Sequence, residues 1–246
     1  MDLIQEVERY VFENIHRFHE ARLNKLTSLK LLELLRKKNP YLYRAKDLNT
    51  PQAIVEALAS AFMSSAEETM FGDWLEQLAV FVASKAYGGY KSTSEGIDLE
   101  MDKEGIHYIV SVKSGPNWSN SSSMKKLLDN FSRAKRVYST GGNRQRCEAV
   151  EGCCYGVDNK PEKVNHIKLC GERFWNFISG SLTMFVDIVE PLGTEARKHN
   201  DMYMKEYSKM ITRFTKDFAN KFCNDDGSIN WALIVRLNAG IEKMKI

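Results

Sequence analysis

The chain has 246 residues, of which 43% are hydrophobic and 27% charged, and its formal net charge is +3. This length and composition predict a folded protein with a sizeable core and exclude a disordered chain. No apolar run is long enough to span a membrane, and the first residues lack the layout of a signal peptide. We therefore expect a soluble protein that stays in the cytoplasm.

The first part of the chain is predicted to be helical. Apolar residues recur at three- and four-residue steps over residues 2–37, which indicates an amphipathic helix. Asn39-Pro40 is expected to end this segment, because proline disfavours helix at the residue before it. Residues 41–49 mix aromatic and basic side chains and are either a DNA contact or a packed connector.

Two further helices are predicted before the first strand. One begins at Thr50-Pro51, an N-cap followed by a proline. The other covers residues 65–86. One side of it carries glutamates and small residues that let another element approach closely: Glu68, Gly72, Glu76, Ala79 and Ala83.

Residues 94–118 are predicted to form a β-hairpin, since two aliphatic, β-branched runs flank a turn signal at residues 102–105. The alternation gives one apolar face, made of Ile97, Leu99, Met101, Tyr108, Val110 and Val112. Directly paired positions across an even-numbered turn share a face. The opposite face is therefore expected to hold Asp98, Glu100, Ser111 and Lys113. A cross-strand ion pair without any catalytic role is an alternative explanation.

This hairpin resembles the motif of the PD-(D/E)XK nuclease superfamily, in which an aspartate begins one strand and an acid-x-lysine lies on the next. Asp98, Ser111 and Lys113 fall on those positions. Ile97 replaces the proline of the family name, and Ser111 replaces an acid. The resemblance covers mainly residues 68–136 and implies an α/β fold, with a mixed central β-sheet flanked by helices and with helical N- and C-terminal segments.

The resemblance also implies a catalytic site. Phosphodiester hydrolysis needs a hard cation, and Mg²⁺ prefers carboxylate oxygens. We expect Asp98 to bind it and Lys113 to orient the attacking water and offset charge on the phosphate. Because Ser111 is a poor ligand, a second acid must come from elsewhere. The preceding helix often supplies one in the superfamily, so Glu76 is the first choice.

Two other acids compete with Glu76 for this role. Glu68 lies on the same side of the same predicted helix. Glu100 shares a strand face with Asp98 but lies about 6–7 Å further along the strand. Each helical glutamate could equally be a solvated carboxylate.

A polar loop and a basic helix follow Lys113. Between Lys125 and Arg146 the one acidic residue is Asp129, which suits a phosphate-rich partner. Serine and asparagine side chains can hydrogen-bond both backbone and bases, although a helix-capping loop explains most of them as well. The residues that we expect to bind DNA are Ser114, Asn117, Trp118, Asn120, Lys125, Arg133 and Arg144.

The rest of the chain is predicted to hold two strands, over residues 147–156 and 164–169, and then helices. Their ranges are about 171–180, 182–189, 194–222 and 228–245. The buried positions of the two strands are expected to be Val150, Cys153, Tyr155, Ile167 and Leu169.

Five cysteines, an odd number without a secretion signal, indicate free thiols. A zinc site is the alternative, and it would combine Cys147, Cys153 or Cys154 with His166 or Cys170. The sequence contains no CxxC pair, which argues against this alternative.

Within the superfamily the sequence looks most like a type II restriction endonuclease. We expect one nuclease domain over residues 1–246, with a helical part at 1–64, a catalytic α/β core at 65–180 and a helical part at 181–246. The resemblance implies Mg²⁺-dependent, sequence-specific hydrolysis of double-stranded DNA by a homodimer. The alternatives are a repair or recombination nuclease of the same fold and a decayed DNA-binding module, which Ser111 favours.

Overall fold

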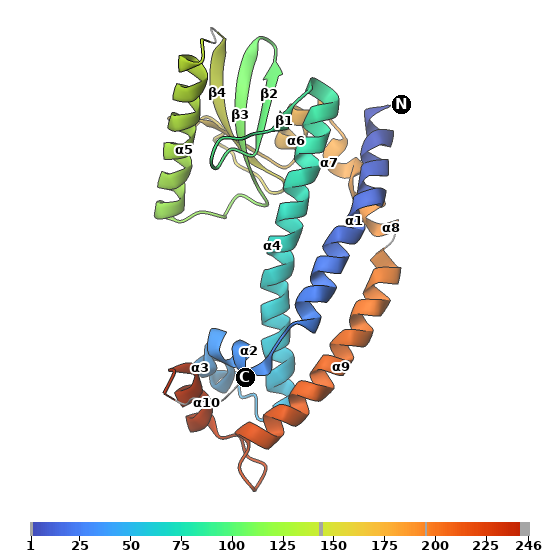
Figure 1. The fold of residues 1–246 in the computed structure, drawn as a ribbon, viewed down its shortest axis with the longest axis vertical. Helices are drawn as coiled ribbons and strands as arrows, with labels where there is room; N and C mark the ends of the chain where they lie inside the picture. The colour runs from blue at the N-terminus through green and yellow to red at the C-terminus, as the bar shows by residue number, and fades with distance from the viewer. Residues whose placement is uncertain (1, 143–144, 195, 242–246) are drawn as a thin grey trace. The chain divides into compact units, whose positions relative to one another are not determined.

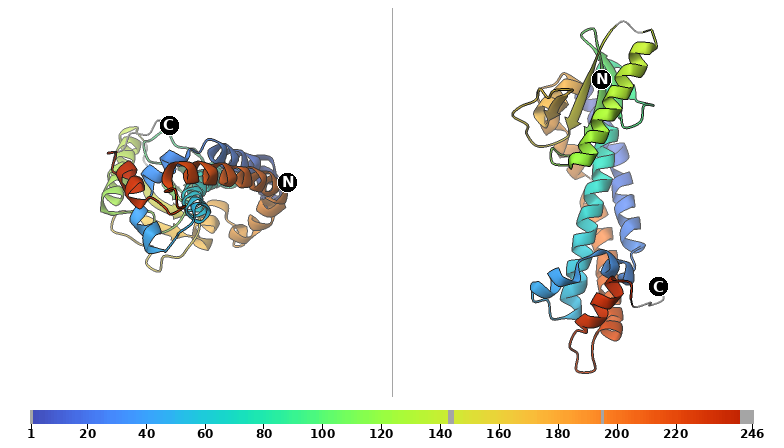
Figure 2. Two further views of the ribbon diagram at one scale, coloured as in Figure 1. Left: turned by 90° about the horizontal axis from the view of Figure 1, so that it is seen from below. Right: turned by 90° about the vertical axis from the view of Figure 1, so that its left-hand side faces the viewer.

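The computed structural model describes residues 2–142, 145–194 and 196–241 (Figures 1 and 2). It confirms the predicted α/β class: a five-stranded mixed sheet flanked by helices, with helical N- and C-terminal segments. The strands are β1 (Tyr90–Lys91), β2 (Leu99–Lys103), β3 (Ile106–Lys113), β4 (Arg146–Cys153) and β5 (Ile167–Cys170). The helices are α1 (Leu3–Thr27), α2 (Leu31–Lys37), α3 (Pro40–Ala45), α4 (Pro51–Tyr87), α5 (Ser121–Thr140), α6 (Glu172–Ser179), α7 (Met184–Asp187), α8 (Val189–Thr194), α9 (Ala196–Phe222) and α10 (Trp231–Asn238).

The chain divides into two compact units. The first, here called the sheet unit, comprises Met1–Ile15 and Phe71–Glu195 and holds all five strands. The second, called the helical unit, comprises His16–Met70 and Ala196–Ile246. Its core is built from leucine and phenylalanine side chains of several helices, among them Leu26, Leu34, Leu58, Phe214, Phe218 and Phe222. No described helix is both long and apolar enough to be a membrane span.

The strand order in the sheet is β1-β2-β3-β4-β5, with the first three strands antiparallel and β3, β4 and β5 parallel. The predicted hairpin is present, but its turn is shorter than expected: Asp102 and Lys103 belong to β2, and the connection is the two-residue loop Glu104-Gly105. Both loop residues have positive φ, 53° and 77°, as the tight hairpin turns that match strand twist require. The even loop sets the predicted register, in which Leu99 pairs with Val110.

Both faces of the sheet are covered. Ala83 of α4 and Leu99 and Met101 of β2 converge on Gly89, where an added Cβ would meet all three at 3.1 Å. On the opposite face, α5 packs against the sheet (Figure 1) through a cluster of Ile97, Ile109, Leu127, Phe131, Ala134 and Ala149. The prediction that Ile97 shares the face of Leu99 is therefore wrong. Ile97 lies before β2 begins, so the alternation of the strand does not fix the direction of its side chain.

Several predicted boundaries are wrong. The two helices expected between residues 50 and 86 are one continuous helix, α4. Pro40 begins a helix as well as following one, since Asn39 caps α3 by accepting the N–H of Tyr41 and proline is favoured at a first helical position. The helix predicted over residues 2–37 is interrupted between α1 and α2.

The last two strands are shorter than predicted. Tyr155 and Val164 lie outside β4 and β5 and are 61% and 99% exposed. The side chains that β5 buries are Lys168 and Cys170, whereas Ile167 and Leu169 are half-buried. All five cysteines are free thiols. Burial raises the pKa of the Cys154 thiol to about 12, so it stays protonated at neutral pH.

Candidate active site

Asp98 lies just before β2 and is held in place by hydrogen bonds to residues of β3. Its backbone N–H donates to the carbonyl of Val110 at 2.8 Å. Its carboxylate oxygen Oδ2 accepts the backbone N–H of Val112 at 2.7 Å and lies 3.3 Å from the hydroxyl of Ser111. The side chain is 15% exposed. Asp98 is thus an oriented carboxylate with Oδ1 facing away from these donors.

Lys113, the last residue of β3, lies on the same side as Asp98, as the alternation predicts. Its Nζ is 3.8 Å from Asp98 Oδ2 and donates to the carbonyl of Val112 at 3.0 Å. The same ammonium lies 5.1 Å from the centroid of the Trp118 ring, within the range of a cation–π interaction. The lysine is therefore bounded by a carboxylate, a carbonyl and an aromatic face.

Glu76 of α4 is joined to Asp98 through a residue that the sequence did not single out. Lys91 Nζ forms an ion pair with Glu76 Oε1 and lies 3.6 Å from Asp98 Oδ1. Burial alone would lower the pKa of Lys91, but its contacts with Glu76 and Asp98 outweigh burial and raise the pKa. One ammonium group therefore bridges two carboxylates and offsets part of their combined negative charge.

Lys91 was missed because β1 is a strand of two residues, too short to show any alternation. Its only sequence signal is a basic residue just after the Gly88-Gly89 break that ends α4. Gly72 on α4 fulfils the expectation of close approach, since a Cβ there would lie 3.4 Å from Ser114 Cβ.

The other two candidate acids have different surroundings. Glu100 accepts from Tyr90 and Ser92 and pairs with Nε2 of the buried His107 at 3.1 Å, so its oxygens are engaged within the hairpin. Glu68 is exposed on the part of α4 that belongs to the helical unit. Among the described residues, no group of three or more histidine, cysteine or acidic side chains could hold a metal. The two carboxylates of Asp98 and Glu76 remain as a pair.

The residues predicted to bind DNA differ in their surroundings. Some are engaged within the protein: Asn120 caps α5 in a reciprocal pair with Ser123, and Arg133 pairs with Glu95 at 2.8 Å. Ser114 is half-buried, and Asn117 and Lys125 are exposed. Arg144 lies outside the described residues.

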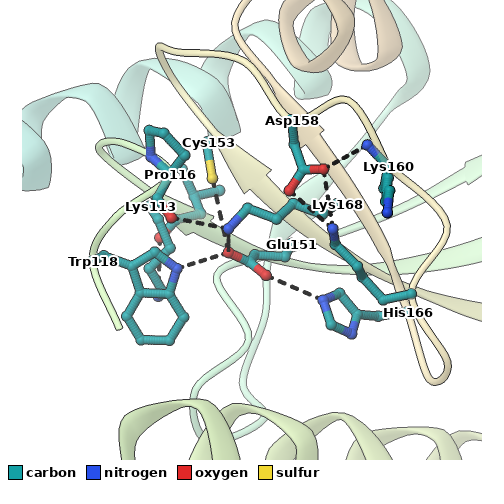
Figure 3. A network of polar contacts seen from close by, with 11 residues as sticks. Lys113, Pro116, Trp118, Glu151, Cys153, Asp158, Lys160, His166 and Lys168 are labelled. Atoms are coloured by element: carbon teal, nitrogen blue, oxygen red, sulfur yellow. Dashed lines mark hydrogen bonds and ion pairs between the residues drawn. The ribbon is translucent and has the colours of Figure 1, made fainter. Parts of the chain in front are cut away.

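Trp118 leads to a buried network that sequence reasoning missed (Figure 3). Its indole N–H donates to Glu151 Oε1 at 2.7 Å. Glu151, which is fully buried in β4, also accepts from Lys168 Nζ at 2.9 Å and from His166 Nε2 at 3.1 Å. Burial alone would raise the pKa of Glu151, but these hydrogen bonds outweigh it and lower the pKa to about 2. Glu151 is therefore ionised.

The network lies beside Asp98 on the same sheet face. Ser111 of β3 is in register with Glu151 of β4, which is in register with Lys168 of β5, and residues paired in this way point to one side. An acid within the apolar run AVEGCC and a lysine within IKLC are the signals that could have revealed it.

Comparison with known proteins identifies the family of the chain. The family model of the type II restriction endonuclease EcoO109I matches residues 5–200, which include both parts of the hairpin, Glu76 and the Glu151 network. No curated protein sequence matches the chain. The chain belongs to the EcoO109I family of type II restriction endonucleases, which are site-specific deoxyribonucleases.

Proposed function

We propose that the chain hydrolyses double-stranded DNA at a specific sequence with Mg²⁺ held by Asp98 and Glu76. Restriction endonucleases typically use Mg²⁺, and this cation is bound through one or two carboxylates while it keeps several waters. The observation that carries the proposal is Lys91, whose ammonium lies between the two carboxylates. Because that point already favours a positive charge, the donor set fits a hydrated divalent cation.

The chain's own residues have distinct roles in this proposal. The N–H of Val112 and the hydroxyl of Ser111 orient Asp98. Lys113 holds the attacking water and offsets negative charge that grows on the phosphate. The attacking water gives up one proton to solvent as its oxygen bonds to phosphorus, one backbone P–O bond breaks, and the leaving oxygen takes up a proton from solvent. When bound, Mg²⁺ would neutralise phosphate charge and lower the pKa of its bound water.

DNA binding is proposed for the loop and helix that follow the site. Asn117 and Lys125 are exposed and are free to reach phosphate or base edges. Ser114, Trp118, Asn120, Arg133 and Arg144 belong to the same proposed surface. The indole N–H of Trp118 is donated to Glu151, so its ring face is what remains for DNA.

We further propose that the whole chain acts as a single nuclease domain in the cytoplasm and as a homodimer, because a two-fold protein matches a two-fold DNA site. Analytical ultracentrifugation with and without duplex DNA tests the dimer. A sedimentation coefficient that fits one chain per duplex would contradict it.

Digestion of a mapped phage genome, followed by sequencing of the fragment ends, tests the activity. We expect discrete fragments from plain duplex, only when Mg²⁺ is added, with one common sequence at the ends. Branched and single-stranded DNA serve as comparison substrates, and a preference for them would instead indicate a repair or recombination nuclease. Binding to duplex without any cleavage would indicate the decayed module that Ser111 suggests.

A further inference from the structure

The loop that leaves Lys113 is attached to the neighbouring strands at two points. Trp118 donates its indole N–H to Glu151 of β4 at 2.7 Å, and the carbonyl of Pro116 accepts from Lys168 of β5 at 2.9 Å. Figure 3 shows both contacts meeting at the Glu151–Lys168 pair. The two charged side chains are almost wholly buried, with 0% and 9% of their side-chain surface exposed. The loop is thus fixed before any DNA arrives.

The Trp118 ring that is held in this way lies next to the candidate catalytic lysine, Lys113. Lys113 Nζ lies 5.1 Å from the ring centroid, and the ring also packs against the cluster under α5. A lysine side chain has several rotatable bonds and loses much freedom when it is held in one place. A fixed aromatic face beside its ammonium restricts where the amine can go.

We infer that Glu151 is a positioning residue of this nuclease, which holds Trp118 so that the ring keeps the Lys113 ammonium beside Asp98. The inference rests on the proposed role of Lys113. Glu151 is fully buried among its hydrogen-bond partners, so it has no exposed surface for DNA or the attacking water. A buried ion pair is often no more stabilising than apolar residues of similar volume, whereas an ionised acceptor makes a stronger hydrogen bond to an N–H than a neutral one does.

The experiment compares three variants of the full-length protein. Trp118→Phe keeps an aromatic ring but removes the N–H that Glu151 accepts. The double variant Glu151→Met with Lys168→Met removes both buried charges and keeps the volume, so neither partner is left as an uncompensated charge. His166→Gln is the matched control, since His166 contacts Glu151 but not the loop. Thermal unfolding reports whether each variant folds.

Two quantities are measured for each variant: the single-turnover cleavage rate at saturating duplex with Mg²⁺, and the Kd for the same duplex without metal. We expect Trp118→Phe and the double methionine variant to cleave about 10- to 100-fold more slowly, as lost supporting contacts typically do. The methionine pair lies outside the proposed DNA-binding surface, so it should change the Kd less than about twofold. Trp118→Phe alters a residue of that surface, so it is judged by its cleavage rate at saturating duplex. His166→Gln should cleave at the wild-type rate.

A combined variant sharpens the result. If Glu151 acts through Trp118, the methionine pair should slow a Trp118→Leu protein much less than it slows the wild type. Independent, additive losses would overturn the inference. So would folded variants that cleave at the wild-type rate, or variants that raise Kd and keep the rate at saturation.

The failure of the inference is distinguishable from failure of the proposed function. Lys113→Ala is measured in parallel and should abolish cleavage without loss of folding. If Lys113→Ala cleaves normally, the proposed role of the lysine is wrong. If Lys113→Ala is inactive while the Trp118 and Glu151 variants are fully active, the lysine is catalytic and the positioning role assigned to Glu151 is wrong.

Discussion

Asp98 with its lysine partners and Glu151 with Lys168 form two neighbouring carboxylate and lysine groups on the same sheet, yet their surroundings differ. In the first group, Asp98 is 15% exposed, and its lysine partners Lys91 and Lys113 are 56% and 25% exposed. In the second, the side chains of Glu151 and Lys168 are 0% and 9% exposed. Ser111, which donates to Asp98, is directly in register with Glu151, so the two groups are adjacent.

The difference lies in which partners can be exchanged. Glu151 accepts from a half-buried indole, a buried imidazole and a buried ammonium, and removing one of these donors without replacing it would leave a buried charge short of a partner. Asp98 Oδ1 faces an exposed, flexible lysine that can swing into water. The same residue types therefore build a buried, fully paired group in one place and a partly exposed group in the other, and the partly exposed group is the one that we propose as the cation site.

Substitution at Asp98 should have the largest effect. Asp98→Asn keeps an oxygen that can accept from Val112 but removes the charge that the proposed metal needs. We expect the Mg²⁺-dependent cleavage rate to fall about 10³-fold, in line with loss of a principal electrostatic contact, with an unchanged melting temperature. Asp102→Asn, which changes an exposed carboxylate bound to His107, is the control. A folded Asp98→Asn protein that cleaves normally would refute the site.

The next largest effect should be a loss of stability in acid that comes from Glu151. The folded state lowers the pKa of Glu151 from 4.5 to about 2, so ionised Glu151 contributes stability above pH 4.5 that is lost as the pH falls towards 2. Between pH 7 and pH 3 this loss is about 2 kcal/mol. Urea unfolding of wild type and Glu151→Gln gives the free energy of unfolding at both pH values. The difference in this free energy between the two proteins should be smaller at pH 3 than at pH 7. A difference that does not change with pH would contradict the ionised, hydrogen-bonded state.

Removal of the second proposed ligand should have a smaller effect on cleavage. Glu76→Gln should raise the Mg²⁺ concentration needed for half-maximal cleavage by about 10- to 100-fold, the scale at which single supporting groups alter metal sites. Excess Mg²⁺ should restore much of the rate. Glu68→Gln and Glu100→Gln are the matched controls and should leave the Mg²⁺ requirement unchanged. A shift with either control and none with Glu76→Gln would reassign the ligand.

The smallest expected effect is the change in Mg²⁺ affinity when the Lys91 ammonium is removed. Lys91→Ala removes an ammonium that must leave before a metal can approach Glu76 and Asp98. Since exposed ion pairs contribute little, we expect Mg²⁺ to bind only about two- to tenfold more tightly. Equilibrium titration of Mg²⁺ against the protein without DNA measures this. Weaker binding in Lys91→Ala would mean that the lysine supports the metal site and does not occupy it.

The sequence was most informative where local patterns decide structure. The turn signal at residues 102–105 and the alternation around it predicted a register that brings Asp98 beside Lys113, although the turn itself is shorter. The small residues on α4 predicted a close approach, which Ser114 makes at Gly72. The register depends on a single turn, and the row of small residues on α4 is a local pattern, although the sequence did not show that Ser114 is the residue that approaches it.

What the sequence did not reveal depends on contacts between distant segments. Lys91 reaches Glu76 and Asp98 from a two-residue strand, and Glu151 meets Trp118 and Lys168 across three segments. In each case a charged side chain stands in a short or apolar stretch that gives no sign of its partners. Only the pairing of β3 with β4 and β5 brings those partners together.

Titration calorimetry of the protein with Ca²⁺ compares the two groups most directly. Ca²⁺ is a hard cation that binds oxygen ligands, and no DNA is present to be cleaved. We predict that wild type and Glu151→Gln bind the ion, that Glu76→Gln binds it about 10- to 100-fold more weakly, and that Asp98→Asn loses binding, with all four proteins folded. Equal binding by wild type and Asp98→Asn would contradict the claim that the exposed carboxylate group is the metal site.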